Sequence, residues 1–103
     1  MSQVDNVTSP HRWDTNGVLK WLQKTEPQLF QLYGELFVKH DVCGIVLMQL
    51  SDNQLLEMGV TDPTHRIEIL HQSMRLQIKY EIFCVKLLQK NINISSESTV
   101  NSN

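Results

Sequence analysis

The stretch "FVKHDVCGIVLMQLSDNQLLEMGV", residues 37–60, combines a His-Asp-x-Cys run, an isolated glycine and two clusters of aliphatic residues. It allows three interpretations: a nucleophilic active site, a metal site, or a small helical core with a rim that binds a partner. A structural zinc site takes four ligands, and a nucleophile needs a base and an oxyanion site, so the first two require residues from elsewhere in the chain. The third requires only the residues quoted.

The rest of the sequence does not supply those residues. His40, Asp41 and Cys43 lack a fourth zinc ligand at a suitable spacing. The other histidines stand apart from this run: His11, His65 and His71. Cys43 precedes an apolar run, where a small buried thiol is the usual finding. We therefore expect no catalytic residues, no cofactor and no metal.

Composition limits the classes of function. A chain of 103 residues, 41% hydrophobic and 19% charged, forms one domain with one modest core. Nine Lys and Arg are set against 11 Asp and Glu and are spread along the chain, which disfavours nucleic-acid binding. The cysteines, Cys43 and Cys84, have no C-x-x-C spacing, and no apolar run approaches the ~20 residues that span a bilayer. We expect a reduced, cytoplasmic protein without membrane insertion.

Apolar residues recur at intervals of three and four, which predicts an all-α domain of five helices. The first covers residues 14–24, with Asp14 as its N-cap. The second begins at Pro27, because proline is tolerated at the first position of a helix.

Two short helices follow. Gly44 is expected to let the chain turn before a short buried helix or turn over residues 45–50. Ser51 and Gln54 have the spacing of a capping box for a fourth helix, which Gly59 ends. Helices this short are marginal alone, so aliphatic side chains must hold one another by tertiary packing. This predicted cluster comprises Leu47, Leu50, Leu55, Leu56, Met58 and Val60.

The last helix is long, because Asp62 caps it, Pro63 occupies its first position, and no breaker precedes Lys90. Near its end, "EIFCVKLL" at residues 81–88 is apolar around much of the circumference. We expect Trp13 and the N-terminal segment to fold back over this end, with coverage by a second protein as the alternative. Residues 1–11 are predicted to be flexible, 12–90 to form the domain, and 91–103 to be a disordered tail.

The order of elements and their motifs resemble the sterile alpha motif (SAM) family. The resemblance covers residues 12–76, roughly two thirds of the chain, and rests on "W-x7-W-L" from Trp13, "LYGELFVKHDVCG", "LMQLSDNQLLEMGV" and "HRIEIL". It implies a five-helix bundle with a long final helix, serving as a non-catalytic adaptor that binds other SAM domains. "KHDVCG" and "EMGVTD" resemble the short stand-alone Aveugle or Hyphen group. That group implies a connector-enhancer-of-KSR-type scaffold as partner, in signalling from Ras to the RAF kinase.

The family resemblance also implies two binding faces, of which a mid-loop face on one copy meets an end-helix face on another. The mid-loop face would carry Asp41, Val42, Asp52 and Glu57. The end-helix face, our second choice, would carry Pro63, Thr64, His65 and Arg66. We predict the mid-loop face as the site because uniform charge repels wrong partners.

Two alternative functions stay open. Some SAM domains bind RNA hairpins through a basic cluster at the start of the last helix, where this chain has Arg66 and Arg75 but also Asp62 and Glu68. A homo-oligomerising SAM domain is the other. With unequal faces we expect weak or no self-association, since head-to-tail contacts between identical copies generate filaments unless they close.

Overall fold

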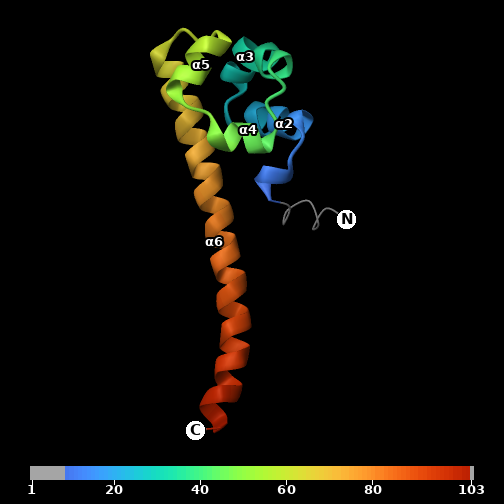
Figure 1. The fold of residues 1–103 in the computed structure, drawn as a ribbon, viewed down its shortest axis with the longest axis vertical. Helices are drawn as coiled ribbons and strands as arrows, with labels where there is room; N and C mark the ends of the chain where they lie inside the picture. Colours follow the sequence, from blue (N-terminus) through green and yellow to red (C-terminus); the bar gives the residue numbers. More distant parts are fainter. Residues whose placement is uncertain (1–8, 103) are drawn as a thin grey trace.

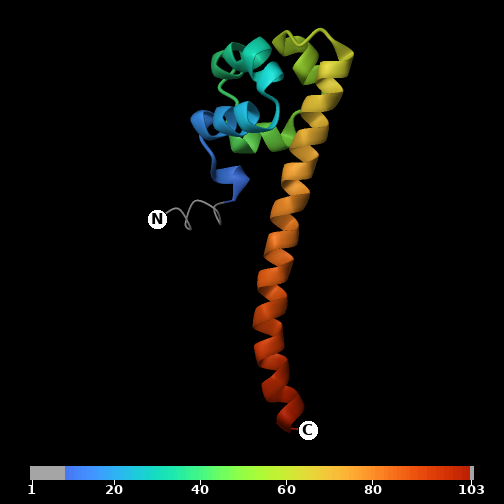
Figure 2. The same ribbon diagram turned by 180° about the vertical axis from the view of Figure 1, so that it is seen from behind.

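The computed structural model describes the backbone of residues 9–102 and the side chains of residues 9–90. Within this range the chain is all-α, without strands, which confirms the predicted fold class. The elements are η1 (Pro10–Arg12, a 3-10 helix), α2 (Thr15–Thr25), α3 (Pro27–Lys39), α4 (Gly44–Gln49), α5 (Asp52–Met58) and α6 (Pro63–Ser102). The helices α2 to α5 gather around the first part of α6, which extends away from them as a single rod (Figures 1 and 2).

The helix boundaries follow local signals in the sequence. Asp14 Oδ1 accepts a hydrogen bond from the Gly17 amide at 2.8 Å, as an N-cap does. The Ser51 hydroxyl accepts from the Gln54 amide and the Gln54 side chain accepts from the Ser51 amide, so the predicted capping box is present. Gly59 ends α5 at φ 118°, a left-handed conformation that favours glycine. The predicted starts of α2 and α5 are thereby confirmed.

The core is a single cluster of buried aliphatic and aromatic side chains. Its members are Val18, Leu22, Leu29, Phe37, Val42, Leu47, Leu55, Val60 and Ile69. Three members of the predicted cluster, Leu47, Leu55 and Val60, are buried. Leu50 and Met58 are half-buried, whereas Leu56 is 43% exposed and its placement in the core was wrong. In the orientation that α5 takes against the bundle, Leu55 points inward and Leu56 outward.

Gly44 has a different role from the predicted one. Its φ is ordinary, and the positive φ at the α3–α4 turn belongs to Asp41, at 51°. A Cβ at Gly44 would lie 1.8 Å from the Pro10 carbonyl oxygen, and the Gly44 amide donates to the Trp13 carbonyl at 2.8 Å. Glycine is needed here because two backbone segments meet. Pro10 is buried, so packing begins before residue 12, while residues 1–8 lie outside the described residues.

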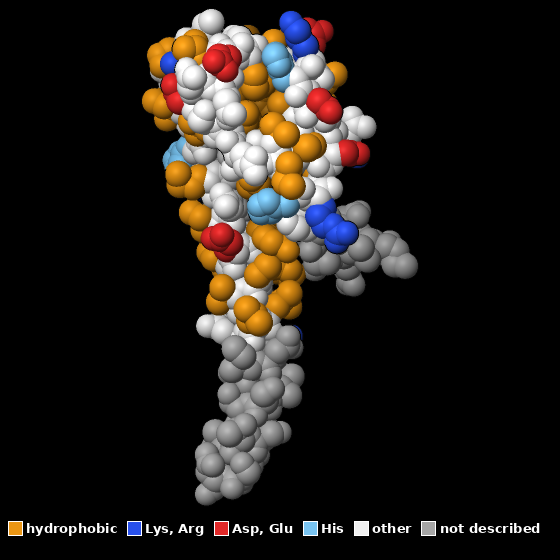
Figure 3. All heavy atoms as spheres, viewed as in Figure 1, with side chains coloured by type: hydrophobic (Ala, Val, Ile, Leu, Met, Phe, Trp, Pro, Cys, Tyr) orange, Lys and Arg blue, Asp and Glu red, His pale blue; other side chains and the backbone are white. Residues whose placement is uncertain are grey.

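The long helix α6 extends well past the bundle. Its helical backbone continues to Ser102, with no proline or glycine after Pro63 to end it. The division of the chain at residue 90 stays a prediction. Phe83 and Cys84 are half-buried, but Ile82, Val85 and Leu88 are 50%, 50% and 58% exposed. Hydrophobic side chains accordingly show along α6 below the bundle (Figure 3). The expected cover over residues 81–88 is therefore incomplete.

Two neighbouring leucines on α5 test this packing. Leu55→Ala should lower the free energy of unfolding by about 2 to 5 kcal/mol, because it leaves a cavity in the core. Leu56→Ala removes the same atoms from a 43% exposed position and should cost at most about 1 kcal/mol. Urea denaturation followed by circular dichroism measures both, and equal losses would contradict the assignment of the core.

Candidate partner-binding faces

The acids predicted for the mid-loop face are all at the surface, but they contact different neighbours. Asp41 follows α3, and its Oδ1 accepts a hydrogen bond from the Thr15 hydroxyl of α2 at 2.9 Å. Asp52 is the first residue of α5 and contacts α6. Glu57 lies exposed on the last turn of α5. The three acids thus lie on the turn after α3 and on α5, and two of them bond to neighbouring helices, Asp41 to α2 and Asp52 to α6.

Val42 does not belong to this face. Its side chain is wholly buried, and its amide donates to the Phe37 carbonyl at 2.9 Å. The left-handed backbone of Asp41 reverses the chain after α3 and directs the next residue into the core. The prediction that Val42 contacts a partner was therefore wrong.

Arg66 joins the two predicted faces to each other. Its Nε donates to Asp52 Oδ1 at 2.8 Å, and one terminal nitrogen donates to the carbonyls of Val60 and Thr61 at 2.9 and 3.1 Å. The Arg66 side chain is only 11% exposed, against 58% for Asp52. Arg66 therefore fastens the α5–α6 loop and supplies no free cation to the end-helix face.

His65 is also engaged within the molecule. Its Nδ1 lies 2.5 Å from the Tyr33 hydroxyl of α3, and its Nε2 lies 3.7 Å from Asp62 Oδ2. Burial, followed by the nearby Asp62 carboxylate, raises the pKa of the Tyr33 hydroxyl above its ordinary value. Tyr33 and Asp62 thus hold the imidazole between them. Of the predicted end-helix residues, Pro63 and Thr64 are exposed.

The His-Asp-x-Cys run forms no metal centre in the part of the chain that the structure describes, where no three potential ligands come together. Cys43 lines a shallow hollow beside the start of α2, together with Asp14 and Asp41. None of the described helices is long and apolar enough to cross a membrane.

Exposed aliphatic side chains on the helices before α6 were not predicted as site residues. Val38 of α3, Ile45 of α4 and Leu56 of α5 are 57%, 51% and 43% exposed. Leu56 had been assigned to the core, and the sequence alone offered no reason to prefer Leu55 for burial. Leu56 directly precedes Glu57 in the sequence and offers apolar contact area beside that acid.

The residues that match known proteins cover the whole bundle. The family model for the SAM domain (sterile alpha motif) matches residues 10–77, from η1 into α6, so the chain belongs to the SAM family. Members of this family are typically protein-interaction modules. The chain is 31% identical over 78 residues to Protein aveugle of Drosophila melanogaster, covering 76% of this chain and 73% of that protein.

The Arg66 contacts generate a stability prediction. Arg66→Ala should lower the free energy of unfolding by about 1 to 3 kcal/mol, because two loop carbonyls and Asp52 lose a charged donor, with the Asp52 contribution reduced by its exposure. Arg75→Ala, at an exposed position on the same helix, should change the free energy of unfolding by less than about 0.5 kcal/mol. Equal melting of the two variants would show that the Arg66 contacts do not hold the loop.

Proposed function

We propose that this chain is a non-catalytic adaptor that binds a SAM domain of another protein through its acidic mid-loop face. The observation that carries the proposal is the charge of residues 40–59, which include Asp41, Asp52 and Glu57 but no lysine or arginine. Like charges over one surface favour a basic partner and repel acidic ones.

The internal contacts of Arg66 and His65 support the choice of the mid-loop face over the end-helix face. A cation that already pairs with Asp52 and two carbonyls is a poor ligand for an acidic partner. Within the mid-loop face, the same pair partly neutralises Asp52. Glu57 is exposed, and the exposed Leu56 beside it in sequence offers apolar area. We therefore assign the strongest contribution to Glu57.

The difference in free charge between the mid-loop and end-helix faces favours pairing with a different SAM domain over pairing with a second copy of this chain. A second copy of this chain would present an end-helix whose arginine is 11% exposed, so it lacks the free basic group that the acidic face requires. The partner's SAM domain supplies a basic end-helix instead. The RNA-hairpin alternative also loses support, because Arg66 is its main cation at the start of α6 and is engaged in the loop.

The similarity to Protein aveugle supports a signalling role for this adaptor. We assign it, as part of the proposal, a connector-enhancer-of-KSR-type scaffold as partner in the cytoplasm, on the path from Ras to the RAF kinase. A small domain that binds one face of such a scaffold acts by holding proteins together, and it requires no chemistry of its own.

Charge reversal at Glu57 tests the face. Glu57→Lys should weaken binding to the SAM domain of a connector-enhancer-of-KSR-type scaffold by roughly tenfold or more, because it places a like charge against the basic end-helix. The matched control is Glu35→Lys, an exposed acid on α3 outside residues 40–59, which should change the affinity by less than about twofold. Isothermal titration calorimetry gives both affinities, and thermal melts check that both variants fold.

This choice of face would be contradicted if the Glu57→Lys variant bound the scaffold SAM domain as tightly as the parent does and had the same melting temperature. An equal loss of affinity in Glu57→Lys and Glu35→Lys would also count against the mid-loop face, because binding would then depend only on the overall charge of the protein. Double reversal at Asp52 and Glu57 is a poorer test, because Asp52→Lys also breaks the pair with Arg66.

A further inference from the structure

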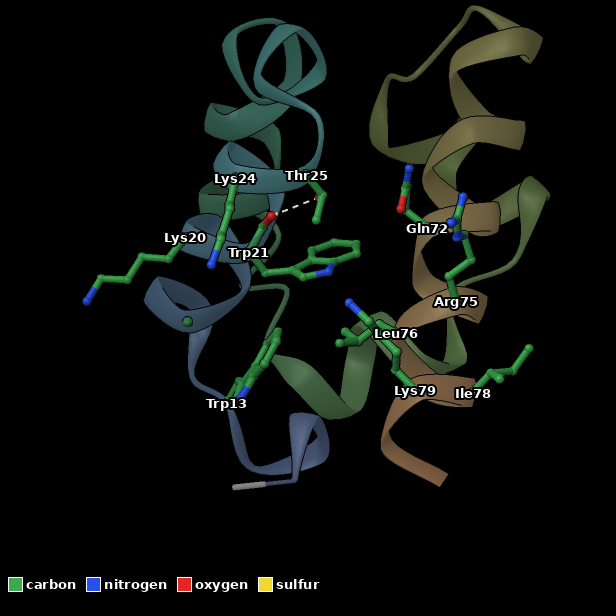
Figure 4. Close-up of a pocket in the computed structure, with 11 residues that line it drawn as sticks. Trp13, Lys20, Trp21, Lys24, Thr25, Gln72, Arg75, Leu76, Ile78 and Lys79 are labelled. Atoms are coloured by element: carbon green, nitrogen blue, oxygen red, sulfur yellow. Dashed lines mark hydrogen bonds between the residues drawn. The ribbon is translucent and has the colours of Figure 1, made fainter. Parts of the chain in front are cut away.

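A groove between α2 and α6 lies outside both predicted SAM faces. It has a volume of about 960 Å³, and its apolar part is made by Trp13, Trp21 and Leu76. The Trp21 indole extends from α2 into the gap, toward Leu76 on the opposite wall (Figure 4). At one end of the groove, Gln72 of α6 donates a hydrogen bond to Glu26 at 2.8 Å. The two walls are therefore tied together across this end.

Cations border this apolar floor on both sides. Lys20 and Lys24 come from α2, and Arg75 and Lys79 come from α6, so four of the nine Lys and Arg in the chain line one groove. The lining includes no aspartate or glutamate. Lys79 reaches from α6 into the gap, whereas Lys24 lies along α2 and Lys20 extends outward from the rim (Figure 4). A groove of this kind presents positive charge around an apolar floor.

Aliphatic and basic side chains continue along α6. Ile78 lines both the groove and a second hollow, whose lining also includes Ile82, Val85 and Lys86 together with one acid, Glu81. The cations Arg75, Lys79, Lys86 and Lys90 follow at intervals of four, seven and four, which keeps them on one side of a helix. From residue 75 to 90 this surface is roughly 22 Å long at about 1.5 Å per residue. An aliphatic stripe and a basic stripe thus run side by side.

We propose that this surface binds an acidic amphipathic helix of a partner protein. The helix would place aliphatic side chains on Trp21 and Leu76, while its carboxylates meet Lys79 and the other cations at the rim of the groove. A helix that lays its apolar face into a groove is a common mode of recognition, and complementary charge selects its orientation. The proposal goes beyond the mid-loop function and uses none of its residues.

Three other occupants fit less well. A second copy of α6 would bring the same basic stripe against itself, and like charges repel. A single-stranded nucleic acid needs a surface of strong positive charge, whereas this chain carries a net charge of −2. A lipid surface is flat, while the groove is concave and walled by two helices.

Tryptophan fluorescence reports on this groove directly, because both tryptophans of the chain line it. The probe is a synthetic helical peptide of about 18 residues, with leucines at intervals of three and four and glutamates flanking them. We expect a saturable blue shift as the peptide covers the indoles. A scrambled peptide of the same composition should produce none, because its leucines share no face.

Charge reversals then locate the site. Lys24→Glu and Lys79→Glu should each weaken peptide binding by roughly tenfold, whereas Lys39→Glu, an exposed cation at the end of α3, should change it by less than about twofold. Glu57→Lys should leave peptide binding unchanged, and Lys79→Glu should leave binding to the scaffold SAM domain unchanged. The two proposals can therefore fail separately.

Several results would overturn the inference. One is that the scrambled peptide binds as tightly as the designed peptide. Another is that Lys39→Glu weakens peptide binding as much as Lys24→Glu and Lys79→Glu do. Tighter binding of a single-stranded oligouridine, or of phosphatidylserine vesicles, would assign the groove to those ligands. Sedimentation of the protein alone as a dimer that Lys79→Glu dissociates would assign it to a second copy.

Discussion

The arrangement of the two candidate binding faces depends on one guanidinium group, that of Arg66. Arg66 bonds to Asp52 at the start of α5 and to two carbonyls of the loop that follows α5, so it sets the position of α5 on the first turn of α6. In the proposed function, α5 carries Asp52 and Glu57 of the mid-loop face, and α6 begins with the residues of the end-helix face. Because Arg66 is engaged in joining α5 to α6, the proposal leaves the end-helix face without a free arginine and gives Glu57 the largest charge contribution on the mid-loop face.

A second constraint is the close backbone approach at Gly44, which fixes the position of the N-terminal segment against α4. The Pro10 carbonyl approaches so closely that any side chain at Gly44 would displace it, and the Gly44 amide holds the carbonyl of Trp13. Trp13 is thereby placed beside α2, where it forms part of the groove with Trp21 and Leu76. The same backbone contact that attaches the N-terminal segment to α4 therefore completes the basic groove.

The elements could be predicted from the sequence because their signals are local. Asp14, Ser51, Gly59 and Pro63 act within a few residues of the boundaries they mark. The pair between Asp52 and Arg66 spans 14 positions and depends on how the loop turns, which no spacing rule supplies.

The errors at single residues have the same origin. Val42 stands between Asp41 and Cys43 and looked like a rim residue, but the left-handed turn at Asp41 buries it. Leu55 and Leu56 are identical in type, and the rotation of α5 decides which one is buried. The groove was not predicted because its cations come from two helices that are distant in the sequence.

The most direct test of the account is a nuclear magnetic resonance titration of the isotope-labelled chain with the SAM domain of a connector-enhancer-of-KSR-type scaffold. Backbone amides report on every candidate face at once, and the indole N–H signals of the two tryptophans report on the groove. The account predicts shift changes concentrated in residues 40–59 around Glu57, with the indole signals unmoved. Changes concentrated at residues 63–66, with residues 40–59 unaffected, would contradict it.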